Sequence, residues 1–194
     1  MLLKNLDKYR IILGSKSPRR RELLHMIRVP FESVVLTGIK EEYPADMDPE
    51  EVPLYLSNLK ANAYLERFEK NVLIITADTL VICEGRIMGK PRDEEDAVKM
   101  LISLSDKKHH VVTGVTLATH RQRTEFTVCT DVKFASITED EARYYVNNFS
   151  PLDKAGAYGI QEWIGGVAVE SIDGSFYNVM GLPVHKLYQE LKNF

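Results

Sequence analysis

Cysteine is scarce in this sequence. Cys83 and Cys129 are far apart and do not form a Cys-x-x-Cys motif, which argues against a disulfide framework and a cysteine-ligated zinc site. We expect both side chains in the core. Histidine does not supply the missing ligands, because His109 and His110 are neighbours that point to opposite faces of a strand. The other histidines have no ligand partners at a recognisable spacing; they are His25, His120 and His185.

Long hydrophobic runs are also absent. The longest, such as "VLIITA" at 72–77, are far shorter than a membrane span. The first residues, "MLLKNLDKYR", are interrupted by charges too early for a signal peptide. The expected location is therefore the cytoplasm, with no membrane partner.

An excess of positive charge is missing as well. The formal net charge of the chain is −3, whereas a nucleic-acid-binding domain usually has a broad basic face. We therefore expect no nucleic-acid partner. A chain of 194 residues with 44% hydrophobic residues, no repeat and no low-complexity tract predicts a single domain over 1–194 with one sizeable core.

The apolar pattern predicts strands interleaved with helices. Strands are expected over 10–15, 31–36, 71–77, 79–83, 109–120 and 123–136, and a hairpin over 165–177 that turns at Asp173-Gly174. Helices are expected over 17–27, 48–68, 92–104, 138–149 and 182–194. Start signals support three of them: Ser17 followed by Pro18, Asp93, and a Thr-x-x-Glu capping box at Thr138. The interleaving predicts a mixed α/β sheet domain.

Positive charge is concentrated at one point, in "SKSPRRREL" after the first strand. The start of a helix presents backbone N–H groups and a partial positive charge, which suit phosphate oxygens. Ser15, Arg19 and Arg20 would add side-chain donors, and arginine binds phosphate bidentately. The cluster is either a triphosphate clamp or a solvated basic helix face.

One carboxylate stands out because it follows a buried strand. Asp78 comes after "LIITA", at the end of a strand, where catalytic groups of α/β folds often lie. A turn-forming or capping role is the alternative. Other charged residues lie near element ends or in short polar breaks; they are Glu41, Glu42, Lys60, Lys90 and Lys154.

Six segments together resemble the Maf family of nucleoside triphosphate pyrophosphatases. They are "ILGSKSPRRRELL", "ADTLV", "GKPRDEEDAVKML", "HVVTGV", "PLDKAGAYGIQ" and "GSFYNVMGLP". The resemblance covers nearly the whole chain. It implies hydrolysis between the α and β phosphates, with a divalent cation, Mg²⁺ or Mn²⁺. It also implies a long, twisted mixed sheet flanked by helices with a central cleft, as in inosine triphosphate pyrophosphatases, and a homodimer.

The resemblance also implies roles for individual residues. Asp78 would be the general base that takes a proton from the attacking water, and Glu41 would join Asp78 in supporting the metal. Glu41 is preferred to Glu42 by register. The residues that would bind the substrate are Ser15, Arg19, Arg20, Lys60, Thr79, Lys90, Lys154 and Gln161. A metal-bound tetra-anion requires such a mixture of cations and a carboxylate.

Three of these residues, Arg19, Thr79 and Gln161, resemble the branch of the family that acts on dTTP and UTP. The amide of Gln161 can accept from N3–H and donate to O4 of uracil or thymine at once. The chain departs from the family pattern at three positions: Gly14 replaces the usual Ala, and Thr76 and Asp106 each replace a usual Gly. None of these changes removes a chemical group. A regulatory nucleotide-binding protein linked to septum formation is the alternative function.

Overall fold

The computed structural model describes residues 2–68 and 70–194. The chain forms two compact units. Unit 1 comprises Met1–Asp78, Thr113–Val128 and Gly181–Phe194, and unit 2 comprises Thr79–Val112 and Cys129–Met180. The single domain over 1–194 stays a prediction. Among the described residues, no helix is both long and apolar enough to span a membrane.

The strands form a mixed sheet, as the sequence predicts. Within the described residues it has seven strands in the order β2-β1-β3-β5-β6-β7, with β4 paired to β3. They are β1 (Arg10–Gly14), β2 (Glu32–Val34), β3 (Val72–Cys83), β4 (Arg86–Met88), β5 (Lys108–Ala118), β6 (Arg123–Phe134) and β7 (Val169–Asp173). The strand β1 runs parallel to β2 and β3, whereas the β3-β4 and β6-β7 pairs are antiparallel.

Three helices begin where the local signals predict, whereas the helix expected from 48 begins at Val52, and the short helices Trp163–Val167 and Phe176–Met180 were not predicted. Ser17 accepts a hydrogen bond from the amide of Arg20, Asp93 accepts from Asp96, and Thr138 forms the expected capping box. The helices are α1 (Pro18–Met26), α2 (Val52–Arg67), α3 (Glu94–Leu104), α4 (Glu139–Phe149), α5 (Trp163–Val167), α6 (Phe176–Met180) and α7 (Val184–Asn193). Short 3-10 helices span Lys4–Leu6, Pro151–Asp153 and Ala155–Ala157.

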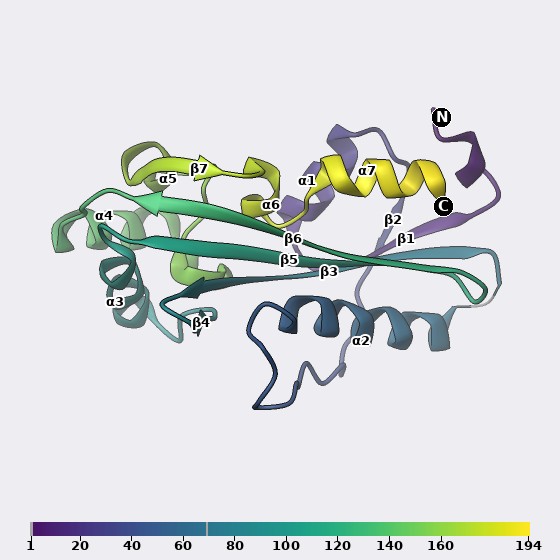
Figure 1. Cartoon of the computed structure of the whole chain (residues 1–194), viewed down its shortest axis with the longest axis horizontal. Helices are drawn as coiled ribbons and strands as arrows, with labels where there is room; N and C mark the ends of the chain where they lie inside the picture. Colours follow the sequence, from purple (N-terminus) through teal and green to yellow (C-terminus); the bar gives the residue numbers. More distant parts are fainter. Residues whose placement is uncertain (1, 69) are drawn as a thin grey trace. The chain divides into compact units, whose positions relative to one another are not determined.

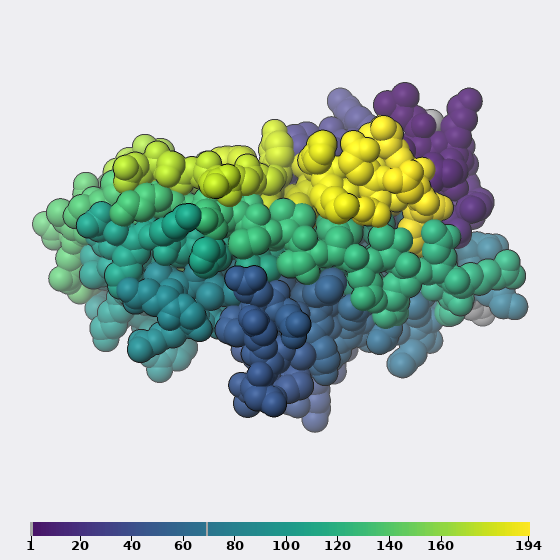
Figure 2. Space-filling model, viewed as in Figure 1, coloured from purple at the N-terminus to yellow at the C-terminus, as the bar shows by residue number. Residues whose placement is uncertain are grey.

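In unit 1 the parallel strands lie between helices. The helix α2 covers one face, and α1 and α7 lie on the other (Figure 1). A core group of Ile12, Tyr64, Val72 and Ile74 fills the space under α2. The dark blue segment before α2 projects from the rest of unit 1 (Figure 2).

Two departures from the family pattern in unit 1 compensate for each other. A Cβ atom on Gly14 would lie 3.0 Å from the methyl carbon of Thr76 and 2.8 Å from the ring of Tyr64. The Thr76 methyl therefore occupies space beside position 14, where the family usually has the methyl group of alanine. The Thr76 hydroxyl also donates to the carbonyl of Ser57, 2.8 Å away, and so ties β3 to α2.

In unit 2, α3 packs on α4 (Figure 1). The third departure, Asp106, has a φ of +55°, a left-handed conformation that favours glycine and that aspartate tolerates better than most residues. Lys133 donates to both the Asp106 carbonyl, at 2.7 Å, and its carboxylate, at 3.0 Å. The added negative charge is thus paired locally.

Two sequence-based expectations for unit 2 were wrong. The hairpin over 165–177 does not form, because β7 pairs with β6 and the chain after Gly174 enters α6. The amide of Ser175 donates to Thr130 on β6, 3.1 Å away, which directs the chain away from a return strand. Cys83 is buried as predicted, and burial raises the pKa of its thiol. Cys129 is exposed instead of buried.

Candidate functional site

Asp78 lies within a strand, which corrects the expectation that it follows a strand end. The strand β3 continues from Val72 to Cys83. The ladder between β1 and β3 covers Val72 to Ile75 only, because β1 ends at Gly14. Asp78 therefore lies in extended backbone beyond the part of β3 that β1 pairs.

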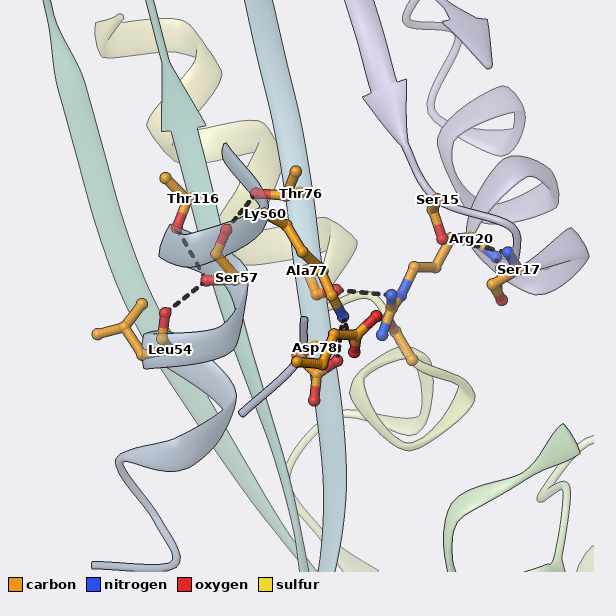
Figure 3. Close-up of polar contacts among 12 residues, drawn as sticks. Ser15, Ser17, Arg20, Leu54, Ser57, Lys60, Thr76, Ala77, Asp78 and Thr116 are labelled. Atoms are coloured by element: carbon orange, nitrogen blue, oxygen red, sulfur yellow. Dashed lines mark hydrogen bonds and ion pairs between the residues drawn. The ribbon is translucent and has the colours of Figure 1, made fainter. Parts of the chain in front are cut away.

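Lys60 joins two carboxylates of unit 1 at one point. Its ammonium nitrogen lies 2.5 Å from Asp78 Oδ1 and 2.8 Å from Glu41 Oε2. The side chains of Lys60 and Asp78 are 12% and 14% exposed, whereas that of Glu41 is 52% exposed. Figure 3 shows Lys60 reaching from α2 toward Asp78 on β3. Two carboxylates thus converge on one partly buried cation.

Arg20 binds the backbone next to this point. Its Nη1 donates to the carbonyl of Ala77 at 2.7 Å (Figure 3). Its Nε donates to the carbonyl of Gly181 at 2.8 Å. Burial lowers the pKa of the Arg20 guanidinium, and the nearby charge of Asp78 opposes this shift. Arg20 therefore supports β3 and the chain before α7, in addition to any ligand that it binds.

The first turn of α1 already uses two serines as hydrogen-bond acceptors. Ser15 is buried, and its hydroxyl accepts from the amide of Ser17 at 3.1 Å. Ser17 in turn accepts from the amide of Arg20. Arg19 is the neighbour of Arg20 in this turn, and its charge also lowers the pKa of Arg20. An anion at this turn would therefore meet concentrated positive charge as well as hydroxyl groups.

Unit 2 contains a second buried lysine with carboxylate partners. Lys154 Nζ lies 2.9 Å from Asp153 Oδ1 and 3.2 Å from Glu162 Oε1, and its side chain is 8% exposed. The hydroxyl of Tyr145 donates to the other oxygen of Glu162 and accepts from the amide of Gly159 at 3.0 Å. This network fixes the loop that carries Gln161.

The other predicted binding residues also belong to unit 2. Lys90 and Gln161 are exposed, and Thr79 is half-buried. The amide of Gly156 donates to the carbonyl of Gly89 at 3.0 Å, which joins the loop of Lys90 to the loop of Lys154. Within unit 1 the structure brings together Arg20, Glu41, Lys60 and Asp78, with Ser15 and Arg19 at the start of α1.

The predicted metal ligands suit a hard divalent cation. Glu41 and Asp78 offer oxygen atoms that already converge on the Lys60 ammonium, and Mg²⁺ and Mn²⁺ prefer carboxylate oxygen ligands. The Lys60 ammonium supplies the positive charge beside these two carboxylates that the cation would supply. The two carboxylates therefore fit the implied cation.

Sequence reasoning missed Tyr145 and Glu162. Tyr145 is buried, and its hydroxyl donates to Glu162. The one local signal was the position of Glu162 directly after Gln161. Nothing in the spacing of Tyr145 and Glu162 predicts their contact, because it depends on how α4 packs.

This chain is similar to one protein family, to named relatives and to solved structures. The family model described as Maf-like protein matches residues 10–194. A dTTP/UTP pyrophosphatase of Porphyromonas gingivalis is 53% identical, over 100% of this chain and 98% of its own length. One of Bacteroides thetaiotaomicron is 52% identical, over 98% and 99%. Among solved structures, the Staphylococcus aureus Ham1 protein is similar over 65% of this chain and 72% of its own, with 12% identity and a TM-score of 0.49.

Proposed function

Because the chain belongs to the Maf family, we propose that it hydrolyses dTTP and UTP to the monophosphate and pyrophosphate. Relatives at 53% and 52% identity carry the name dTTP/UTP pyrophosphatase. The observation that carries the proposal is the convergence of Glu41 and Lys60 on Asp78 of β3. This group combines a candidate base, a candidate metal ligand and a cation for phosphate.

Asp78 is the general base in this proposal. Before substrate binds, the Lys60 ammonium forms an ion pair with the Asp78 carboxylate at 2.5 Å. When triphosphate oxygens attract the ammonium, Asp78 can accept the proton of the water that attacks the α phosphorus. The bond to the β phosphate then breaks, and pyrophosphate leaves. Orienting and deprotonating the water is worth about 10²–10⁴-fold in rate.

Several cations and one hydroxyl group hold the phosphates in the proposal. Ser15 acts from the turn before α1, Arg19 and Arg20 act from the first turn of α1, and Lys60 acts from α2. Lys90 and Lys154 are the further phosphate ligands. Glu41 and Asp78 would hold Mg²⁺ or Mn²⁺, which neutralises phosphate charge and makes the α phosphorus more electrophilic. Arg20 also needs its bonds to Ala77 and Gly181, so its loss would affect folding as well as binding.

Gln161, Arg19 and Thr79 select the base in the proposal. Gln161 is exposed and lies on a loop that Tyr145 and Glu162 fix. Its amide can then meet the N3–H and O4 edge of uracil or thymine with one acceptor and one donor. Cytosine presents the opposite pattern at these two atoms and would require the flipped orientation of the amide.

We further propose that the enzyme works as a single domain over 1–194, forms a homodimer and acts in the cytoplasm on the nucleotide pool. A regulatory nucleotide-binding protein linked to septum formation is the weaker alternative, because such a protein would not need Asp78 beside a full set of phosphate-binding cations.

The test is a panel of dTTP, UTP, CTP and GTP with Mg²⁺ or Mn²⁺, with products identified by ion chromatography. We expect pyrophosphate as the primary product, fastest turnover of dTTP and UTP, and no turnover in excess EDTA. Orthophosphate as the primary product, or full activity without metal, would contradict the proposal. Nucleotide binding without turnover would favour the regulatory alternative.

A further inference from the structure

A second group of metal-ligating side chains lies in unit 2. His110 is on β5, and Cys129 and Asp131 are on β6, the hydrogen-bonded neighbour of β5 (Figure 1). One ligand atom from each residue lies within 4.8 Å of the other two. The donors are an imidazole nitrogen, a thiol sulfur and a carboxylate oxygen. Their combination differs chemically from the all-oxygen pair of Glu41 and Asp78.

Strand alternation brings these three side chains to the accessible face. His109 points into the core, where its Nε2 lies 2.8 Å from the hydroxyl of Tyr158, whereas the side chain of His110 is 42% exposed. On β6, Thr130 and Val132 are buried, while Cys129 is exposed and the side chain of Asp131 is 24% exposed. An ion from solvent can therefore reach all three donors.

The carboxylate of Asp131 is already bound by two positively polarised groups. Its Oδ1 lies 2.6 Å from His110 Nδ1, and its Oδ2 lies 2.5 Å from Lys108 Nζ. The hydrogen bond from Lys108 is the largest of the causes that lower the pKa of Asp131. Asp131 is thus ionised and aligned with His110, while Lys108 competes for its second oxygen.

From this arrangement we infer that His110, Cys129 and Asp131 form a binding site for a zinc-class transition metal, separate from the proposed triphosphate site. Ligand atoms of a tetrahedral zinc ion lie roughly 3.5 Å apart, so small side-chain rotations bring atoms within 4.8 Å into a common shell. Nitrogen and sulfur donors favour Zn²⁺, Co²⁺ or Cu²⁺ over Mg²⁺. Water completes the fourth position.

The binding step balances in protons. Cys129 releases its thiol proton to solvent and binds as thiolate. In the hydrogen bond with the ionised Asp131, His110 carries a proton on Nδ1. On metal binding this proton moves through solvent to Nε2, the Nδ1 lone pair binds the metal, and Asp131 exchanges its hydrogen bond for a metal bond. No electron is transferred.

Cobalt titration of the metal-stripped full chain tests the site. Co²⁺ bound by a thiolate gives a sulfur-to-metal charge-transfer absorption that oxygen ligands do not give. We expect this band to saturate at one equivalent, to disappear when Zn²⁺ is added and to persist in excess Mg²⁺. Cys129→Ser should abolish the band. His110→Gln and Asp131→Asn should weaken Zn²⁺ binding, measured by competition with a chromophoric chelator, by roughly tenfold or more.

Three controls keep the test specific. Cys83→Ser should leave the band unchanged, since Cys83 is buried in the core of unit 2. Asp78→Asn should also leave it unchanged, which separates this site from the proposed catalytic one. Lys108→Ala should tighten Zn²⁺ binding, because it removes a competitor 2.5 Å from Asp131. Absence of the band in the parent protein, or its persistence in Cys129→Ser, would overturn the inference.

Discussion

Two buried lysines, one in each unit, have different surroundings. Lys60 meets Asp78 and Glu41, and Glu41 is half exposed on a projecting segment. Lys154 meets Glu162, which Tyr145 holds through its hydroxyl. The carboxylates around Lys60 can therefore exchange the ammonium for another cation. Beside Lys154, Asp153 is also half exposed, but Glu162 is fixed by the Tyr145 hydroxyl. The first arrangement suits chemistry, and the second suits the positioning of a lysine and of Gln161 beside it.

The same change, carboxylate to amide, should give different results in the two units. Asp78→Asn should lower kcat by about 10²–10⁴-fold for every substrate, because the amide keeps the shape but cannot take a proton. Glu162→Gln should raise KM and keep kcat within a few-fold. Steady-state kinetics with dTTP and UTP, with nucleotide binding measured separately, distinguish the two. Equal losses of kcat would remove the distinction between chemistry and positioning.

A change at Gln161 should alter the choice of base. Gln161→Glu replaces the donor to O4 of uracil or thymine with a second acceptor. An unsatisfied acceptor costs about 1–3 kcal/mol, so kcat/KM for dTTP and UTP should fall by about ten- to a hundredfold. Slow turnover of GTP should change much less. Asp78→Asn serves as the control, because it should lower kcat/KM for all substrates. A uniform loss in Gln161→Glu would make this residue a support of the fold or the chemistry.

Removing the hydroxyl that fixes Glu162 should loosen unit 2. Tyr145→Phe leaves the amide of Gly159 and a Glu162 oxygen without their partner, which should cost about 1–3 kcal/mol of unfolding free energy. The KM for all nucleotides should rise, because Lys154 and Gln161 lose their common support. Tyr144→Phe is the matched control, since Tyr144 is exposed, and it should change stability by less than about 0.5 kcal/mol. Equal effects of the two variants would show that this hydroxyl has no special role.

The packing that ties β3 to the helix of Lys60 can be tested by a double-mutant cycle. Gly14→Ala should destabilise by about 1–3 kcal/mol, because its Cβ meets Tyr64 and Thr76. Thr76→Ser removes the crowding methyl group and keeps the bond to Ser57, so part of the loss should be recovered, with a coupling of about 0.5 kcal/mol or more. Gly166→Ala, where nothing lies within 4 Å, is the control. Additive effects at positions 14 and 76 would refute the compensation.

Local signals in the sequence predicted the starts of three helices, because each cap is a hydrogen bond between residues three positions apart. Ser17, Asp93 and Thr138 cap helices as expected. The continuation of β3 past Asp78 depends on pairing with other strands, such as that of β4 with Val81–Cys83, which the residues around Asp78 do not encode. The contact of Glu41 with Lys60 crosses a long connection with no periodic pattern. The exposure of Cys129 was predictable, however, since Phe126, Val132 and Phe134 follow a two-residue period that puts Cys129 on the opposite face.

The central claim is that Asp78 directs water to the α phosphorus, and the most direct measurement is hydrolysis of dTTP in water labelled with heavy oxygen. Mass spectrometry of the products shows which one carries the label. The account predicts that the label enters the nucleoside monophosphate, with unlabelled pyrophosphate. Label in pyrophosphate would mean attack at the β phosphorus, and label in orthophosphate would mean attack at the γ phosphorus; either result would contradict the account.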